Sequence, residues 1–233
     1  MDTLIFDFDN TVSLGDGPAV AYALAVEELS EGKVSKGAIV EPFLANIDKP
    51  NYEGIEITDS YHLVRVLAEA QGVNADTIQA AYFRSREKLA TEDAPIHAPK
   101  NLAEMLREIR DVHGGNVRIA LVTNAPDTRL TEALEALGLS GLFDEVHASA
   151  RKPAGMGELA QGWLNEGRVL SVGDIWVNDL EPVHNLGGDT ALIASRIGDT
   201  TPTFFYEDIT RLYPDLQAWL VNEPSLTNQN PIH

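Results

Sequence analysis

Short runs of apolar residues recur along the chain and predict buried β-strands. They cover residues 3–8, 117–123, 168–172 and 190–194, and a weaker run covers 145–148. A strand that is apolar almost throughout is typical of a parallel sheet, because helices cover both faces of such a sheet.

Between these strands, apolar positions at helical spacing predict helices. One pattern covers residues 102–112 and stops at Gly114, a second covers 130–137 and stops at Gly138, and a third covers 209–220. Glycine commonly ends a helix because it adopts the left-handed backbone conformation without strain. The alternation of strands and helices predicts an α/β fold with a doubly wound, mostly parallel, Rossmann-like sheet.

Residues 15–95 break this alternation. Four helical patterns lie there, around 18–30, 37–47, 58–71 and 75–91, without a convincing strand. We therefore predict an inserted all-helical domain over residues 15–95 and a core domain formed by residues 1–14 and 96–221. Residues 222–233 are polar and contain proline, and we expect them to form a flexible C-terminal tail.

Composition limits the class of protein and its partners. The chain has 233 residues, no cysteine and a formal net charge of -19. The absence of cysteine excludes disulfides and thiolate chemistry, and the negative charge opposes binding to nucleic acid or to anionic membranes. No apolar run approaches the roughly 18 residues of a membrane span, and no signal peptide is evident, so we expect a cytoplasmic protein.

Candidate chemistry begins at Asp7 and Asp9, which close the first predicted strand. Alternation along a strand directs both side chains to one side and Phe8 away from it. Ligands of open α/β sheets bind beyond the carboxyl ends of the strands, and two carboxylates there need a cation. The alternative is a simple strand-end turn with a capping aspartate.

Polar residues also follow the second strong strand and the weaker one. Thr123 and Asn124 offer a hydroxyl and backbone N–H groups to a phosphoryl oxygen, although Thr-Asn is also a common turn. Pro153 suits the first turn of a helix, which places Lys152 at the helix N-terminus. A cation there is unfavourable unless an anion lies beside it, and the alternative is a solvated surface lysine.

Two further carboxylates follow the strand over 168–172. Asp174 comes directly after Gly173, and Asp179 comes five residues later. Their natural partner is a hard divalent cation, and Mg²⁺ fits because it takes one or two carboxylates and binds substrate phosphate. The alternative is an aspartate-capped helix start.

In this order the segments resemble the four motifs of the haloacid dehalogenase (HAD)-like hydrolase superfamily. The resemblance spans about residues 3–195, and the inserted helical domain is similar to the C1 cap of its phosphatase branch. Two features depart from common relatives. Gly155 and Gly157 follow Lys152, so we expect the helix there to begin late, and Ile175 stands where a serine is frequent.

The resemblance implies a Mg²⁺-dependent phosphatase that forms an aspartyl-phosphate. Asp7 would be the nucleophile, and Asp9 would act as general acid and then as general base. The Mg²⁺ ligands implied are the Asp7 side chain, the Asp9 backbone carbonyl, Asp174 and Asp179. Lys152 and Thr123, with the Asn124 N–H, would stabilise the phosphoryl oxygens. The partner implied is a small phosphorylated metabolite.

The predicted cap offers few clear candidates. The glycines in residues 13–18 make that segment a candidate hinge. The polar cap residues able to meet a substrate, each better explained as a solvated helix-face group, are His62, Arg65, Arg84, Arg86 and Lys88. The tyrosines that we expect to pack in the cap core are Tyr22, Tyr61 and Tyr82.

Other functions stay open at this level. A phosphomutase of the same superfamily would keep both aspartates, whereas a dehalogenase needs neither Asp9 nor a Mg²⁺ site. A non-catalytic phospho-receiver or binding module also combines aspartates, Thr and Lys, but such receivers are about half this length. The sequence identifies neither the substrate nor whether the protein is a monomer or a homodimer.

Overall fold

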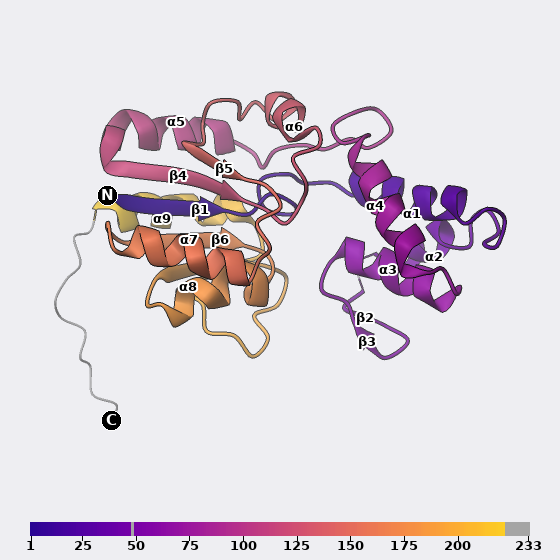
Figure 1. Ribbon diagram of the computed structural model, residues 1–233. Coiled ribbons are helices and arrows are strands. Elements are labelled where there is room, and N and C mark those ends of the chain that lie inside the picture. The colour runs from indigo at the N-terminus through magenta and orange to yellow at the C-terminus, as the bar shows by residue number, and fades with distance from the viewer. Residues whose placement is uncertain (48, 222–233) are drawn as a thin grey trace.

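The computed structural model describes residues 1–47 and 49–221, which form a sheet-containing lobe and a helical lobe (Figure 1). The predicted tail over 222–233 lies outside the described residues. Among the described helices, none is long and apolar enough to cross a membrane.

A six-stranded parallel sheet forms the first lobe, with strand order β5-β4-β1-β6-β7-β8. Its strands are β1 (Asp2–Phe6), β4 (Val117–Val122), β5 (Glu145–His147), β6 (Val169–Gly173), β7 (Asp189–Ile193) and β8 (Phe204–Tyr206). This arrangement confirms the predicted α/β class. β8, which has three residues, was not predicted from the sequence. The central strand β1 pairs with β4 and β6, so the ends of all three lie together.

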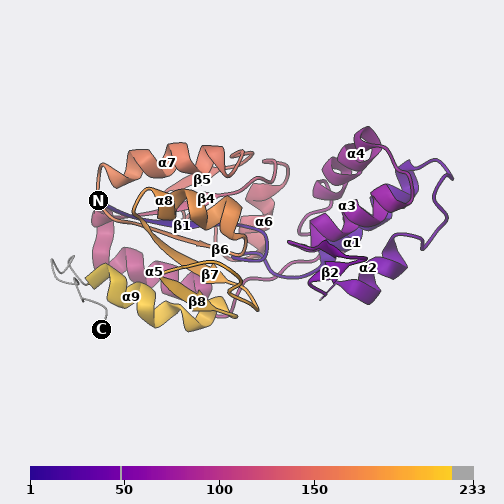
Figure 2. The ribbon, with the colours of Figure 1, turned by 90° about the horizontal axis from the view of Figure 1, so that it is seen from below.

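Helices cover both faces of the sheet (Figure 2). One face carries α5 (Leu102–His113), α6 (Leu130–Ala136) and α9 (Tyr213–Val221), and the other carries α7 (Ala154–Leu164) and α8 (Glu181–Asn185). Short helical turns complete the lobe: η1 (Gly114–Asn116), η2 (Trp176–Leu180) and η3 (Ile209–Arg211). Successive residues of β1 point to opposite faces of the sheet. Leu4 and Phe6 pack in the core on one face, and Ile5 packs in the core on the other. The apolar run that predicted this strand therefore reflects burial on both sides.

The helical lobe has a hydrophobic core of its own. Its helices are α1 (Gly17–Leu29), α2 (Val40–Asn46), α3 (Ser60–Ala70) and α4 (Ala75–Arg86). The prediction that this region holds no strand is wrong, because β2 (Asn51–Tyr52) and β3 (Ile55–Glu56) form an antiparallel hairpin. Glu53 and Gly54 make the turn with φ of 48° and 84°. Two-residue strands set by a left-handed turn leave no alternating pattern in the sequence.

The two chain segments that join the lobes lie side by side. Leu14 and His97 exchange backbone hydrogen bonds of 2.8 and 2.9 Å in an antiparallel bridge. Gly17 packs so closely that an added Cβ would lie 2.4 Å from the Pro95 carbonyl oxygen. The domain boundaries near 14 and 96, and the hinge over 13–18, stay predictions.

Candidate active site

Four distant segments converge at the carboxyl edge of the sheet. Asp7 follows β1, Thr123 follows β4, Asp174 follows β6, and Lys152 lies just before α7. Parallel strands end at one edge, so residues that follow neighbouring strands become neighbours. With Asp9, Asn124 and Asp179, these residues line a cleft of about 170 Å³.

The Lys152 ammonium group links the cluster. Its Nζ donates to Asp7 Oδ1 at 2.5 Å, to Asp179 Oδ1 at 2.6 Å and to the Val122 carbonyl at 3.0 Å. Burial lowers the pKa of Lys152, but the charges of Asp7 and Asp179 raise it above its ordinary value on balance. Lys152 is therefore a buried, fully protonated cation, and the alternative of a solvated surface lysine is wrong.

Three carboxylates crowd together beside this ammonium. One oxygen each from Asp7, Asp174 and Asp179 lies within 4.8 Å of the others. Burial, and then the charge of Asp179, raise the pKa of Asp7 to about 7. Burial, and then the charge of Asp7, raise the pKa of Asp174 well above its ordinary value. One lysine does not balance three carboxylates, of which Asp7 and Asp179 are buried and Asp174 is half-buried, so the cluster favours a further cation.

Asn124 positions Lys152 through its side chain. Its Oδ1 accepts a hydrogen bond from the Lys152 N–H at 2.6 Å, and its Nδ2 donates to the Lys152 carbonyl at 3.2 Å. The Thr123 hydroxyl accepts from the Ala125 N–H at 3.0 Å. The sequence predicted a role for the Asn124 backbone N–H only. The two hydrogen bonds from the Asn124 side chain act as a clamp that holds the loop of Lys152 against the loop of Asn124, and the sequence did not predict them.

A glycine allows α7 to begin close to the site. The helix begins at Ala154, directly after Pro153, so the expectation of a late start is wrong. An added Cβ on Gly155 would lie 1.8 Å from the Ala150 carbonyl oxygen. The backbone at Gly155 thus presses against the loop that carries Lys152, which only glycine permits.

Gly155→Ala is therefore expected to destabilise the protein by at least about 2 kcal/mol, because the atom it meets belongs to the backbone and cannot rotate away. It should also displace Lys152 from its contacts with Asp7 and Asp179. Gly157→Ala is the matched control in the same helix, since its Cβ would meet only Pro182 Cβ at 3.9 Å. Alanine there should stabilise the helix by about 0.5–1 kcal/mol. Urea unfolding of both variants checks the contrast, and equal stabilities would contradict it.

Asp179 and Asp174 are held by the turn that follows β6. Asp179 Oδ2 accepts from the Ile175 N–H at 2.9 Å, which fixes the carboxylate that faces Lys152. Asn10 donates from Nδ2 to Asp174 Oδ2 at 3.1 Å, and its φ of 61° makes this reach possible. Asn10 was not singled out from the sequence, although asparagine in a turn is known to tolerate the left-handed conformation.

Asp9 belongs to a different set of contacts. Its Oδ1 accepts from Arg86 Nη1 at 3.1 Å and from the Tyr61 hydroxyl at 3.2 Å. The expectation that Arg86 is solvated is wrong, because its side chain is 0% exposed. Tyr61 packs against Tyr22 as expected, but it also lines the cleft, as does Tyr82.

The other polar residues of the helical lobe behave as expected. Arg65 pairs with Glu69 at 2.8 Å on the exposed face of α3. Arg84 and Lys88 lie 3.9 and 3.8 Å from carboxylates, and these side chains remain solvated. His62 contacts the exposed Thr58 hydroxyl at 3.1 Å.

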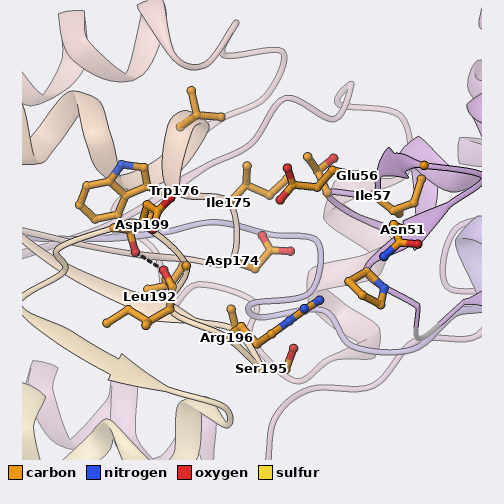
Figure 3. Close-up of a pocket in the computed structure, with 18 residues that line it drawn as sticks. Asn51, Glu56, Ile57, Asp174, Ile175, Trp176, Leu192, Ser195, Arg196 and Asp199 are labelled. Atoms are coloured by element: carbon orange, nitrogen blue, oxygen red, sulfur yellow. Dashed lines mark hydrogen bonds between the residues drawn. The ribbon is translucent and has the colours of Figure 1, made fainter.

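A second, larger cleft adjoins the first (Figure 3). Its volume is about 900 Å³, and it lies between the β2–β3 hairpin and the loop over 194–200. Figure 3 shows Arg196 extending from that loop toward Asn51 of the hairpin, with Asp174 between the two sides. Both clefts include Asp174 and Ile175 in their walls, so the larger one opens onto the acidic cluster.

The fold of this chain is shared with solved structures described as HAD-like hydrolases and phosphatases. Over 94% of its length the chain matches a protein described as a predicted phosphoglycolate phosphatase from Haemophilus somnus, with 97% of that chain covered, 17% identity and a TM-score of 0.63. A second match is a protein from Bacillus subtilis that is assigned as a HAD-hydrolase and was solved bound to magnesium. It has a TM-score of 0.61 and 16% identity, and the match covers 92% of this chain and 97% of that one.

A candidate β-phosphoglucomutase from Thermotoga maritima shares the fold as well, with a TM-score of 0.56 and 15% identity over 94% of this chain and 99% of the other. No protein-family model matches the chain, and no curated protein matches it in sequence. Identities this low establish the fold, which is that of HAD-like phosphatases and related enzymes, and leave the reaction to be argued from the site.

Proposed function

We propose that this protein is a Mg²⁺-dependent phosphatase of the HAD-like superfamily, in its C1-capped branch. It would hydrolyse a small phosphate monoester through an aspartyl-phosphate on Asp7. The observation that carries the proposal is the Lys152 ammonium group, which joins Asp7 to Asp179 beside Asp174 at the carboxyl edge of the sheet. An oxygen nucleophile, a metal site and a cationic clamp are the parts that phosphoryl transfer requires.

The donor set fits Mg²⁺. Carboxylate oxygens of Asp7, Asp174 and Asp179 lie within reach of one ion. With them we propose the backbone carbonyl of Asp9, and Asp179 binding directly or through water. When bound, the ion supplies positive charge that neutralises the phosphoryl oxygens and orients them. It would also relieve the repulsion that raises the pKa values of Asp7 and Asp174.

The reaction has two steps. A carboxylate oxygen of Asp7 attacks phosphorus, the ester P–O bond breaks, and the leaving oxygen takes a proton from Asp9. Asp9 then removes a proton from water, which attacks phosphorus, breaks the bond to Asp7 and releases inorganic phosphate. Proton transfer by a positioned carboxyl contributes roughly 10²–10⁴-fold to such reactions.

Lys152 and Thr123 stabilise the transferring group. The ammonium already contacts Asp7 Oδ1 at 2.5 Å, so a phosphoryl group on the other Asp7 oxygen would lie beside it. The Thr123 hydroxyl, with the Asn124 N–H, would receive a second phosphoryl oxygen. Fixed donors of this kind act where charge develops in the transition state.

The leaving group would occupy the larger cleft. The cleft of about 170 Å³ around Asp7 suits a phosphoryl group, and the cleft of about 900 Å³ opens next to it. The β2–β3 hairpin and the 194–200 loop would therefore contact the leaving group and determine substrate specificity. We propose a small phosphorylated metabolite as the substrate, because the net charge of -19 opposes polyanionic partners.

Hydrolysis of p-nitrophenyl phosphate tests the function. We expect Mg²⁺-dependent release of phosphate that EDTA abolishes, followed by selective turnover in a screen of phosphorylated metabolites. Isomer formation from a sugar phosphate, without phosphate release, would favour the phosphomutase alternative. Binding of Mg²⁺ and phosphate without either reaction would contradict the proposal and indicate a non-catalytic phosphate-binding module.

Mg²⁺ is expected to raise the thermal stability of the protein more at pH 8 than at pH 5.5. The folded-state pKa of Asp7, about 7, lies above the ordinary value of 3.8. Between these values the folded state holds more protons than the unfolded state, so the stability of the metal-free protein falls as pH rises through this window. Mg²⁺ binds the ionised carboxylates and thereby restores the stability that the metal-free protein loses as the pH rises.

At roughly 100 times its dissociation constant, Mg²⁺ should stabilise the protein at pH 8 by about 2.7 kcal/mol, or roughly 5 °C or more in Tm. Thermal unfolding in EDTA and in Mg²⁺ at both pH values measures this effect. Asp174→Asn should remove most of it, whereas Asp93→Asn, on an exposed loop, should leave it intact. An equal shift at both pH values would contradict the expectation.

A further inference from the structure

Two side chains of the helical lobe, Arg86 and Tyr61, contact Asp9, the proposed general acid–base of the sheet lobe. Arg86 is the last residue of α4, and its Nη1 lies 3.1 Å from Asp9 Oδ1 and 3.4 Å from Asp9 Oδ2. The side chain of Arg86 is 0% exposed, and that of Asp9 is 25% exposed. A buried guanidinium thus spans the two lobes and ends on a group that the reaction uses.

Tyr61 of α3 completes a three-membered contact. Arg86 Nη1 donates to the Tyr61 hydroxyl at 2.9 Å, and that hydroxyl donates to Asp9 Oδ1 at 3.2 Å. Burial and the Asp9 charge raise the pKa of Tyr61 well above its ordinary value, so the hydroxyl keeps its proton. Two donors from the helical lobe therefore fix one carboxylate oxygen and leave Oδ2, with its longer contact, for proton transfer.

Structural stability alone does not explain an arginine here. Its Nε and Nη2 are buried without a hydrogen-bond partner, which is costly for a charged group. The Phe8 ring, 5.9 Å from the guanidinium carbon, offsets a part of that cost. An apolar side chain of similar volume would fill the same space and stabilise the fold at least as well. Arg86 is also absent from the walls of both clefts, so its position suits contact with Asp9 rather than with a substrate.

We propose that Arg86 is a positioning residue that aligns Asp9 for proton transfer only when the helical lobe is docked on the sheet lobe. Closure of the helical lobe over a substrate and alignment of the acid–base are then one event, because the donors and the acceptor lie on different lobes. The inference rests on the proposed function for its kinetic consequence, and on the ion pair alone for its effect on docking.

Kinetics test the alignment. Arg86→Met is expected to lower kcat by about 10- to 100-fold on an alkyl phosphate, whose leaving group needs a proton, with KM little changed. The loss on p-nitrophenyl phosphate should be several-fold smaller, since its leaving group departs as an anion. In an Asp9→Asn background Arg86→Met should cost almost nothing further, because both changes remove one interaction. Independent, multiplying effects would overturn the proposal.

Controls separate positioning from packing. Arg84→Met removes a solvated arginine two residues away on the same helix and should leave activity unchanged. Tyr61→Phe should lower kcat by about 3- to 10-fold, because it removes one of the two donors. Arg86→Lys keeps the charge without the geometry and should recover only a part of the activity. If Arg86→Met does not fold, Arg86→Lys and Tyr61→Phe carry the same test, and unchanged kcat in both would overturn the proposal.

Solution scattering tests docking without turnover. Arg86→Met and Asp9→Asn should each enlarge the radius of gyration of the metal-free protein, while Arg84→Met should not. An absence of phosphatase activity in the wild-type protein would contradict the proposed function, but the radius of gyration would still test the docking role of Arg86. Unchanged dimensions in both variants would overturn the docking role of Arg86.

Discussion

Asp7→Asn is expected to lower phosphate-ester turnover by more than about 10⁴-fold, because asparagine cannot supply the oxygen that attacks phosphorus in the proposed mechanism. The replacement has nearly the same shape and removes one of three crowded carboxylates, while Lys152 keeps its contact with Asp179 at 2.6 Å. The variant should therefore fold normally, and its loss of activity should reflect chemistry alone.

Rapid quenching after mixing with a ³²P-labelled ester tests for the proposed aspartyl-phosphate directly. The wild-type protein should carry a label that hydroxylamine removes, as an acyl-phosphate requires, and Asp7→Asn should carry none. Asp9→Asn should still accept the label and lose it slowly, since in the proposed mechanism Asp9 activates the water that hydrolyses the aspartyl-phosphate. Full turnover by Asp7→Asn at saturating Mg²⁺ would refute the nucleophile assignment.

Lys152→Met is expected to have the second-largest effect. It removes the cation that contacts Asp7 at 2.5 Å and Asp179 at 2.6 Å in a buried site. Breaking one side of a buried ion pair costs about 3–5 kcal/mol, so the metal-free variant should be far less stable at pH 8. Loss of the clamp on the transferring group should lower kcat by about 10²–10³-fold.

Urea unfolding and steady-state kinetics separate these two consequences. Mg²⁺ should recover much of the stability of Lys152→Met, because it replaces a positive charge beside the carboxylates, but it should not recover the activity. Lys100→Met, which removes an exposed lysine of the same lobe, should alter neither. A Lys152→Met protein as stable as the wild type in EDTA would mean that the ammonium does not balance the cluster.

The fold class was accessible from sequence because both of its signals are local. The two-sided burial of β1 appears as a continuous apolar run, and α5 appears as a periodic pattern that ends at Gly114. The brief elements were not accessible. The β2–β3 hairpin depends on left-handed residues at Glu53 and Gly54, and β8 is defined by its pairing with β7 rather than by its composition.

The site was only partly accessible. Aspartates that directly follow apolar strands indicated Asp7 and Asp174, because strand ends of a parallel sheet meet at one edge. The role of Asn124 as a clamp on Lys152 depends on the distance between two loops, which no spacing in the sequence encodes. Arg86 was expected in solvent because arginine is almost never fully buried unless it is paired.

The sequence by itself therefore determined the α/β class and the set of acidic and basic groups at the strand ends. The spacing of hydrophobic residues and the position of a residue at a strand end are properties of short segments. They can therefore be recognised without knowledge of the rest of the chain. Only the tertiary structure decided which of those groups touch, and that a buried arginine of the helical lobe faces Asp9. Contacts between segments distant in sequence depend on how the lobes pack, and burial of a charge is a property of its surroundings rather than of its own segment.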